Sequence, residues 1–246
     1  MDIGELAGDL SPHVERLRAA RASVPDPPRW YLYETLSNLP HLDALLEGPY
    51  RDLDRLAGGR PVADIGAADG DLAFTLEAAG GWTVDIVDTA KSNMNGLEGA
   101  RRLKEALGSQ VGIHDIDLDA QFRLTRDAYG LVIFLGILYH LQNPFYALAQ
   151  LAAASRYCLL STRLARYAGP ERAAIAHLPV GYLVGPTELN NDASNYWVFT
   201  PAGVDRIVAR AGWNVVSQLH LGDVEGSTPD SSEHDERVFM LLESAR

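Results

Sequence analysis

The sequence predicts an α/β fold, in which a helical extension precedes one doubly wound, mostly parallel sheet of seven strands. Short apolar runs alternate with helix-like segments from residue 62 to residue 161, which is typical of βαβ units. The run 131–135, LVIFL, is apolar throughout, as expected at the centre of a parallel sheet. The runs 213–221 and 237–243 have no helix between them, which predicts a closing antiparallel pair.

The helical extension is expected at residues 1–58, and the main domain at residues 59–246. Apolar residues recur every three or four positions in 1–22, with Ser11-Pro12 suited to begin a second helix, and again in 42–56. Prolines between these stretches predict a linker. The aromatic side chains after the linker either pack against the main domain or form a lid over a substrate pocket; they are Trp30, Tyr31 and Tyr33.

The elements of the main domain follow from apolar runs and from the residues that end them. A glycine follows three of the helices, and Thr200-Pro201 is a favourable start for the last one. The range 163–200, rich in Gly, Pro and Asn, is expected to be irregular. The strands are expected at 62–65, 82–87, 111–118, 131–135, 157–161, 213–221 and 237–243, and the helices at 72–79, 94–107, 144–154 and 201–211.

The stretch 62–88 is typical of the first half of a nucleotide-binding unit, because a buried strand, a small-residue turn, a helix and a second strand follow one another. The dinucleotide pattern GxGxxG fails here, since Ala68 and Asp71 occupy two of its glycine positions. The pattern acid-x-Gly-x-Gly-x-Gly fits Asp64, Gly66 and Gly70, with Ala68 as its one departure. The alternative interpretation is an ordinary α/β turn followed by a surface acid, Asp88.

Composition limits the possible partners. The chain has 246 residues, a net charge of −12 and a pI near 4.9, which argues against a nucleic-acid partner because such proteins usually carry a basic face. The single cysteine, Cys158, excludes a disulfide framework and a cysteine zinc site, and we expect it to be a buried core thiol. No apolar run approaches the length of a membrane span, so we expect no membrane partner and a cytoplasmic protein.

Together with the turn, the segment 134–144, FLGILYHLQNP, resembles the class I S-adenosylmethionine (SAM)-dependent methyltransferases. The form GILYHxxxP is similar to the subgroup that includes the bacterial wobble-uridine tRNA carboxymethyltransferase, and to related methyltransferases of small molecules and sugars. The segment 195–213, NYWVFTPAGVDRIVARAGW, resembles the helix before strand six of the same subgroup. The resemblance covers roughly residues 60–220 and implies a Rossmann-like methyltransferase sheet and SAM as the cofactor.

The resemblance also implies which residues bind the cofactor. Those at its methionine and ribose part would be Asp64, Gly66, Ala67 and Gly70, with Asp88 on the ribose and Thr89 beside it. Those at the adenine would be Asp115 and Ile116. Those whose backbone lies near the sulfonium would be Phe134, Leu135 and Gly136.

Methyl transfer from a sulfonium is an in-line displacement, so that positioning alone can supply roughly 7–11 kcal/mol of the barrier. A base is needed only if the acceptor must lose a proton. Tyr139 and His140 are the candidate catalytic residues, because they follow the fourth strand, where the crevice of such a sheet opens. Alternatively, His140 is a structural histidine that orders the loop 142–144.

Other polar groups have two possible interpretations each. The cluster at the end of the third strand has ligands for a hard cation, although solvated acids are the simpler interpretation and we expect no metal; it comprises His114, Asp115, Asp117 and Asp119. Arg163 and Arg166 either bind an anionic substrate or are ordinary surface charges. Several residues form turns or contribute to a substrate pocket beside Trp197; they are Asn190, Asn191, Asp192 and Asn195. The loop 222–236 either repels phosphates at one flank of the substrate mouth or is merely solvated; its acids are Asp223, Glu225, Asp230, Glu233, Asp235 and Glu236.

We therefore expect a SAM-dependent methyltransferase that acts on an O or N atom of a small-molecule substrate. The alternatives are a tRNA wobble-uridine-type alkyltransferase and a non-catalytic SAM-binding module. An NAD-dependent oxidoreductase is disfavoured by Ala68 and Asp71. The sequence leaves open the acceptor, whether a homo-oligomer forms, and whether the donor is SAM or a carboxylated variant of it.

Overall fold

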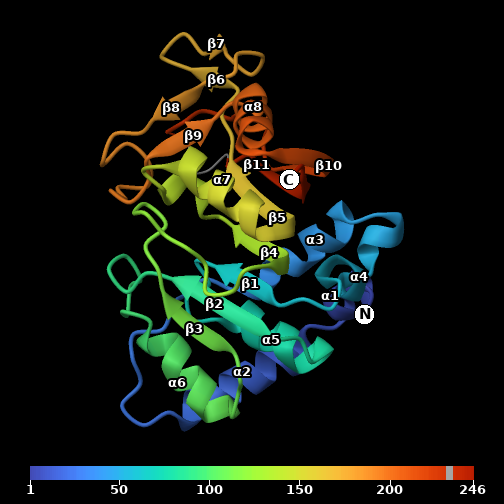
Figure 1. Cartoon of the computed structure of the whole chain (residues 1–246). Coiled ribbons are helices and arrows are strands. Elements are labelled where there is room, and N and C mark those ends of the chain that lie inside the picture. Colours follow the sequence, from blue (N-terminus) through green and yellow to red (C-terminus); the bar gives the residue numbers. More distant parts are fainter. Residues whose placement is uncertain (231–234) are drawn as a thin grey trace. The chain divides into compact units, whose positions relative to one another are not determined.

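The computed structural model describes residues 1–230 and 235–246, and its elements are labelled in Figure 1. A seven-stranded sheet has the strand order β3-β2-β1-β4-β5-β11-β10. Strand β1 pairs in parallel with both β2 and β4, β2 pairs in parallel with β3, and β10 and β11 are antiparallel. The predicted α/β class with a seven-stranded sheet and a closing antiparallel pair is confirmed. The strands of this sheet are β1 (Val62–Ile65), β2 (Val84–Asp88), β3 (Gly112–Asp115), β4 (Tyr129–Leu135), β5 (Ser155–Arg163), β10 (Trp213–Leu221) and β11 (Arg237–Ser244).

Each of the four helices predicted for the main domain is present among the described residues, and the short helix η3 was not predicted. Those of the first 57 residues are α1 (Ile3–Gly8), α2 (Ser11–Ser23), η1 (Thr35–Asn38), α3 (Leu39–Leu45), η2 (Gly48–Arg51) and α4 (Leu53–Ala57). Those of the main domain are α5 (Asp71–Gly80), α6 (Glu98–Leu107), η3 (Leu138–His140), α7 (Pro144–Ala154) and α8 (Pro201–Ala211). In the part of the chain that the structure describes, no helix is both long and apolar enough to cross a membrane.

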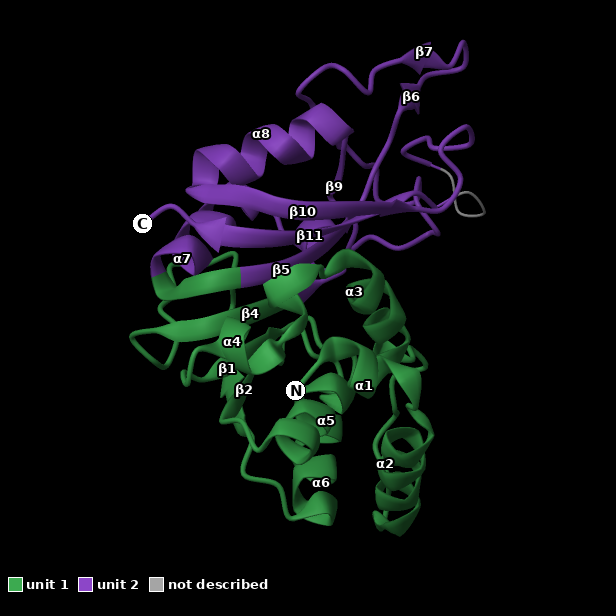
Figure 2. Ribbon diagram, turned by 90° about the vertical axis from the view of Figure 1, so that its right-hand side faces the viewer, with its two compact units in different colours: residues 1–133, 154–157 green, residues 134–153, 158–246 purple. Residues whose placement is uncertain are grey.

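The chain divides into two compact units, which Figure 2 shows in separate colours. Unit 1 comprises residues 1–133 and 154–157, and unit 2 comprises residues 134–153 and 158–246. The division differs in kind from the predicted boundary at residue 58, which stays a prediction, because the first 57 residues belong to unit 1 together with β1, β2 and β3.

In unit 1, the core forms around β1, whose four residues are all buried, and around the apolar face of α5. Helix α2 packs along α6, and η1 packs against α5, so the N-terminal segment contacts the helices of the first two βαβ units (Figure 1). The range 42–56 is not one helix, contrary to the periodicity, because Gly48 has φ +52° and Pro49 follows it. This gives α3, η2 and α4 in its place.

Two further boundaries in unit 1 differ from the expectation by three residues or more. Helix α6 begins at Glu98 and not at 94, because Gly96 and Leu97 both adopt positive φ angles and the Asn93 side chain accepts from Leu97 N. Strand β3 ends at Asp115 and not at 118, although Ile116 N still donates to Asp88 O at 2.9 Å. Both changes add loop at the carboxyl ends of β2 and β3, where the predicted cofactor acids lie.

Unit 2 has short strands in the range 163–200, which was expected to be irregular. These pair as two small antiparallel sheets: β6 (Tyr167–Ala168) with β7 (Ala173–Ala174), and β8 (Gly181–Leu183) with β9 (Trp197–Phe199). A buried cluster of Ala165, Val184, Leu189 and Val198 holds this region together. The expected N-cap of α8 is confirmed, since Thr200 Oγ1 accepts from Gly203 N at 3.0 Å.

Candidate functional site

The turn after β1 has the backbone geometry that its glycines predict. Gly66, Ala68 and Gly70 have φ angles of +68°, +55° and +87°, a region that favours glycine. A Cβ on Gly70 would lie 2.5 Å from Ile86 Cδ1 and 2.9 Å from Phe74 Cε2, so packing also requires a glycine there. Ala68 adopts the left-handed conformation without being glycine, at a cost of roughly 1–2 kcal/mol. Such strain is typical of ligand sites.

Asp64 is the most unusual acid of this turn. Its side chain is 5 % exposed, and Oδ2 has no hydrogen-bond partner in the part of the chain that the structure describes. Burial, and secondarily the charge of Asp88, raises the pKa of the Asp64 carboxyl to about 7. A cation bound beside this carboxylate would relieve both effects.

The predicted ribose and adenine residues lie together at the ends of β2 and β3. Asp88 and Asp115 are opposite one another in the register of these strands. Asp88 Oδ1 accepts from Thr89 N at 2.7 Å and Oδ2 accepts from Asn93 Nδ2 at 2.9 Å. Asp115 is exposed, and its Oδ1 accepts from Ala90 N at 2.9 Å. The structure thus brings Asp88, Thr89, Asp115 and Ile116 to one edge of unit 1.

Sequence reasoning missed a second carboxylate of the turn, Asp69, which is only 2 % exposed. Its Oδ2 accepts from Tyr31 N at 2.7 Å, and its Oδ1 accepts from Asn95 Nδ2 at 2.8 Å. Arg21 Nη2 lies 3.8 Å from Asp69 and 2.6 Å from Asp71 Oδ1. The N-terminal extension is therefore hydrogen-bonded to the turn itself. The sequence signal that could have identified Asp69 was its position inside the turn motif, between Ala68 and Gly70.

The aromatic residues of the extension have different environments. Tyr31 is half-buried, and its hydroxyl accepts from Met94 N at 2.7 Å. Trp30 lies against the Arg21 guanidinium, 5.4 Å from ring centroid to Cζ. Tyr33 is 72 % exposed. Contact with the main domain is confirmed for Tyr31, whereas Trp30 packs against Arg21 within the extension and Tyr33 projects into solvent.

These features fit SAM chemically. The unpartnered carboxylate of Asp64 suits a cationic group, the left-handed turn 66–70 brings backbone close to a ligand, and the acid after β2 suits vicinal hydroxyls. β1 and β4 are parallel neighbours, with Asp64 opposite Ile133, and strand order reverses between them. Ligands of doubly wound sheets bind at the carboxyl ends of strands at such a reversal.

In unit 2, the turn after β4 contains the remaining predicted residues. Phe134 is fully buried, whereas Leu135 and Gly136 are partly exposed, and Gly136 has φ +73°. A Cβ on Gly136 would lie 3.5 Å from the Tyr139 hydroxyl. Tyr139 is buried, and its ring centroid is 4.3 Å from that of His140. Of the reaction-side residues predicted from the sequence, Gly136, Tyr139 and His140 are therefore neighbours.

His140 is held by Ser194 and not by its own turn. Nδ1 lies 3.0 Å from Ser194 O and 3.1 Å from Ser194 Oγ. The Ser194 hydroxyl donates to Asp192 Oδ1 at 2.7 Å, so both Ser194 oxygens face His140 as acceptors. Nδ1 must then carry the proton, which leaves Nε2 with its lone pair. Burial lowers the pKa of His140, with a further contribution from Arg237, so the ring is neutral near pH 7.

Arg237, the first residue of β11, is the functional candidate of unit 2 that sequence reasoning missed. Its Nη1 lies 3.4 Å from the Tyr139 hydroxyl, and its Cζ lies 5.7 Å from the centroid of that ring. Its Nε donates to Asp235 Oδ2 at 2.8 Å, and Asp235 Oδ1 faces Arg163 Nε at 3.1 Å. The only sequence signal for Arg237 was its charge directly before the apolar run VFMLL of β11.

The interpretation of Arg163 as a surface charge is wrong, because the residue is 3 % exposed and pairs with Asp235. Arg166 is also ion-paired: its Nε and Nη2 donate to the buried Glu236 carboxylate, at 2.9 and 2.7 Å to Oε1. A solvated loop 222–236 is likewise wrong for Asp235 and Glu236, whose charges are matched by these arginines. Glu233 lies outside the described residues.

The other polar groups have structural partners. His114 Nε2 lies 3.3 Å from Asp85 Oδ1, and the described residues contain no group of three or more His, Cys, Asp or Glu arranged to hold a metal. Asn190 and Asn191 occupy left-handed turn positions, and Asn195 donates to Leu189 O and Asp192 O, so these residues form turns. Cys158 is fully buried, as expected.

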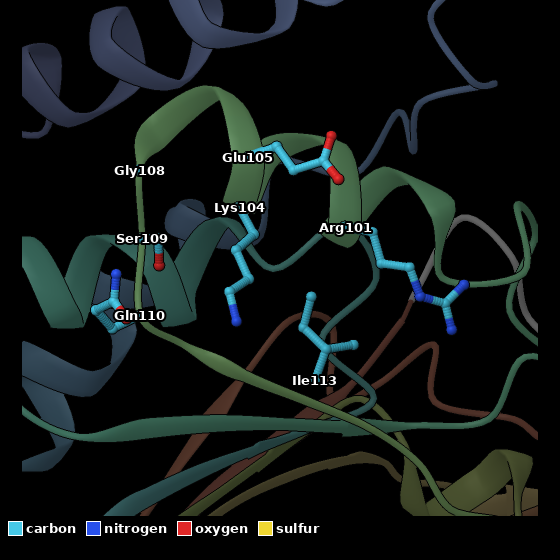
Figure 3. Close-up of a pocket in the computed structure, with 7 residues that line it drawn as sticks. All are labelled: Arg101, Lys104, Glu105, Gly108, Ser109, Gln110 and Ile113. Atoms are coloured by element: carbon cyan, nitrogen blue, oxygen red, sulfur yellow. The ribbon is translucent and has the colours of Figure 1, made fainter.

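A hollow of ≈ 440 Å³ lies apart from these residues, at the end of α6 and the start of β3 (Figure 3). None of the predicted site residues lines it, and we assign it no role. Its lining residues are Arg101, Lys104, Glu105, Gly108, Ser109, Gln110 and Ile113.

No protein-family model and no curated protein matches the sequence. Among solved structures, the chain is similar to the N-terminal domain of EvdMO1 with SAH bound (15 % identity, 95 % of this chain and 97 % of that one, TM-score 0.55). It is also similar to an S-adenosylmethionine-dependent methyltransferase from Mesorhizobium loti (13 % identity, 84 % and 97 % covered, TM-score 0.57). A third similar structure is the [4+2]-cyclase SpnF (10 % identity, 98 % and 95 % covered, TM-score 0.56). At these identities the likeness establishes the fold, which is the Rossmann-like fold of class I methyltransferases.

Proposed function

We propose that the protein is a SAM-dependent methyltransferase that transfers a methyl group to an O or N atom of a small molecule. The observation that carries this proposal is the turn after β1, where the buried carboxylate of Asp64, with one oxygen unpartnered among the described residues, precedes three residues with left-handed backbone. The neighbouring strands β2 and β3 end in two further acids, Asp88 and Asp115. The fold is one in which such turns bind SAM, and one similar structure contains SAH.

The residues of unit 1 have the roles of holding the cofactor. Asp64 would face its cationic part, Asp88 with Thr89 the ribose, and Asp115 with Ile116 the adenine. When bound, SAM supplies an activated methyl group. The extension contributes as well, because Tyr31 N and Asn95 fix Asp69 within the turn.

The residues of unit 2 have the roles of the acceptor side. His140 Nε2 keeps its lone pair because Ser194 fixes the proton on Nδ1, so His140 can take a proton from an acceptor hydroxyl or amine. Phe134, Leu135 and Gly136 are the cofactor residues of this unit, since their backbone at the end of β4 would lie near the sulfonium. Tyr139 packs beside His140 and orients its ring.

Calorimetry with SAM, SAH and NAD tests the cofactor. We expect binding of SAM and SAH but not of NAD, and a loss of at least tenfold in SAM affinity for Asp88→Ala. Asp127→Ala, an exposed acid of the same unit, is the matched control and should bind as the wild type does. A folded protein that does not bind SAM would contradict the proposal.

A panel of small molecules incubated with methyl-labelled SAM then tests the activity. Transfer of label to a metabolite supports the small-molecule assignment. The tRNA alternative instead requires binding that weakens steeply with salt, because phosphate contacts release counterions. The net charge of −12 speaks against it.

A second candidate is a protein of the same fold that binds the cofactor without transferring its methyl group. The similarity to SpnF, described as a cyclase, is what favours considering it. SAM binding with no labelled product across the panel would favour this second candidate.

A further inference from the structure

We propose that Arg237 and Tyr139 form a binding position for a carboxylate of the methyl acceptor, so that the substrate is a small organic acid. The inference rests on the proposed function and concerns the acceptor side of the same site. It follows from how the guanidinium is held, from what surrounds it, and from the unit in which it lies.

The Arg237 guanidinium is held by one edge. Its Nε donates to Asp235 Oδ2 at 2.8 Å, and Asp235 is itself oriented by the buried Arg163 on its other oxygen. This leaves the end of the guanidinium, formed by Nη1 and Nη2, directed away from Asp235. Two parallel N–H groups at such an end match the two oxygens of a carboxylate.

Tyr139 and Gly136 define where this end lies. Nη1 is 3.4 Å from the Tyr139 hydroxyl, and both groups lie within 4 Å of the place that a Cβ on Gly136 would occupy, at 3.8 and 3.5 Å. Gly136 has no side chain to fill that place. A carboxylate near it could accept from the guanidinium and from the tyrosine hydroxyl together. The Arg237 side chain is 33 % exposed, so a small ligand can reach it.

The position belongs to the acceptor side. Arg237 and Tyr139 lie in unit 2 with His140 and Ser194, whereas the residues assigned to the ribose and the adenine lie in unit 1. Gly136, whose backbone is assigned to the sulfonium, lies beside Tyr139, so the position is on the side of the methyl group. The rings of Tyr139 and His140 are neighbours, and strand β9, with Trp197, packs against their helical turn η3. An acid held by Arg237 would thus lie close to the candidate base. A carboxylate also suits one guanidinium beside Asp235 better than a dianionic phosphate would.

Ligand-observed NMR on the full chain saturated with SAH tests the proposal. The probes are acetate, benzoate and 4-hydroxybenzoate, each compared with its primary amide. We expect at least one acid to bind tenfold or more tightly than its amide, and Arg237→Gln to remove that preference. Arg206→Gln, the same change at an exposed arginine of α8, should retain it. No acid preference in the wild type, or a preference that survives Arg237→Gln, overturns the proposal.

A second measurement separates binding from a purely structural role. In the wild type, a bound acid should raise the pKa of His140 followed by NMR, because it neutralises the nearby arginine; in Arg237→Gln the same acid should leave it unchanged. SAH affinity of Arg237→Gln should equal that of the wild type, which shows that the variant is folded. Arg237→Lys, which keeps the charge, should retain part of the acid preference. An acid that binds without moving the His140 titration overturns the proposal.

The donor is the other possible source of a carboxylate. A SAM analogue with a carboxymethyl group in place of the methyl distinguishes the two sources. If Arg237→Gln weakens this analogue tenfold and leaves the acids unaffected, the acceptor assignment is overturned. Failure of the wild type to bind SAH is a different result, because it overturns the proposed function, whereas intact SAH binding without acid preference overturns only this inference.

Discussion

The turn of unit 1 from Asp64 to Gly70 is seven consecutive residues, whereas in unit 2 the side chains around Tyr139 come from segments far apart in the sequence. His140 meets Ser194 across 54 positions, and Tyr139 meets Arg237 across 98. The turn depends on backbone angles that few residues adopt, and the cluster depends on side-chain pairs. Substitutions that change the backbone conformation should therefore disrupt the turn most, and substitutions that remove one side chain of a pair should disrupt the cluster most.

The two regions also handle charge differently. Asp64 is buried with one carboxylate oxygen lacking a partner among the described residues. In unit 2, Glu236 is just as deeply buried, yet its carboxylate accepts from the Arg166 guanidinium and lies 3.2 Å from His220 Nδ1. An unpartnered buried acid is costly and is retained where a ligand can compensate it. The contrast supports the ligand position proposed at Asp64, whereas Glu236 belongs to an ion pair with Arg166.

Substituting one glycine in each region should give the largest difference. Gly70→Ala combines a φ of +87° with contacts of 2.5 Å to Ile86 and 2.9 Å to Phe74, so we expect a loss of roughly 2–5 kcal/mol in unfolding free energy. Gly136→Ala has φ +73° but meets nothing closer than 3.5 Å, so only the backbone cost of about 1–2 kcal/mol applies. Urea unfolding measures both. Equal losses would show that backbone conformation alone governs both turns.

Replacing the two buried acids by their amides should give effects of opposite sign. Because the pKa of Asp64 is about 7, raised from 3.8, its contribution to stability is full below pH 3.8 and is lost as pH rises toward 7. Relative to Asp64→Asn, the wild type without cofactor should lose up to about 4 kcal/mol between pH 4 and pH 8. Glu236→Gln should instead destabilise by about 1.5–3 kcal/mol, since the partly exposed Arg166 loses the charged acceptor of its hydrogen bonds.

Unfolding of both variants and of the wild type at pH 4, 6 and 8 measures these differences. SAM affinity of the wild type should increase over the same range, because the cofactor's cationic part requires the ionised Asp64. An Asp64→Asn variant whose stability relative to the wild type is the same at every pH would contradict the assignment of a raised pKa.

The sequence was sufficient in both units wherever its signals are local. Strand β1 and the N-cap at Thr200 were predicted to the residue, and so were the ends of α6 and α8 at Gly108 and Gly212, because each depends on residues within a few positions. The break at Gly48-Pro49 was also a local signal, but apolar periodicity outweighed it in the prediction. The late start of α6 depends on Asn93, whose side chain bonds Leu97 N and Asp88, and which no helical pattern reveals.

The acceptor side could not be predicted in this way. Nothing near Arg237 in the sequence indicates Tyr139, and nothing near Arg163 indicates that Asp235 makes it a buried charge. Arg163 and Asp235 meet because β5 and β11 are adjacent in the sheet, an order that the sequence pattern does not contain by itself. Asp69 lies within the predicted small-residue turn, but its bonds to Tyr31 and Asn95 were not foreseen because these residues come from distant segments.

The rate of methyl transfer in a His140 variant tests the proposed role of this residue on the acceptor side. If it is a general base, His140→Gln should lower the rate of methyl transfer by about 10²-fold for acceptors that must lose a proton. Since its pKa is lowered by burial, the wild-type rate should be level around pH 7 and fall on the acid side, and the variant should lack this fall. Ser194→Ala keeps the backbone oxygen that binds Nδ1, so a loss of only a few-fold is expected. Equal losses in the two variants would assign His140 a structural role.

The smallest expected effect is a gain in stability at Ala68. Its φ of +55° costs roughly 1–2 kcal/mol for alanine, while glycine loses about 0.4–1 kcal/mol more through the unfolded chain. Ala68→Gly should therefore stabilise the protein by about 0.5–1 kcal/mol in urea unfolding. Asn190 in unit 2 has φ +54°, but asparagine tolerates this region, so Asn190→Gly should give no gain. If Ala68→Gly and Asn190→Gly raise the unfolding free energy equally, left-handed backbone costs the same in the two regions. The strain at Ala68 would then not distinguish the cofactor turn from other turns. If only Ala68→Gly stabilises, and SAM binds no more tightly to it, alanine there is a tolerated cost and not a requirement for the ligand.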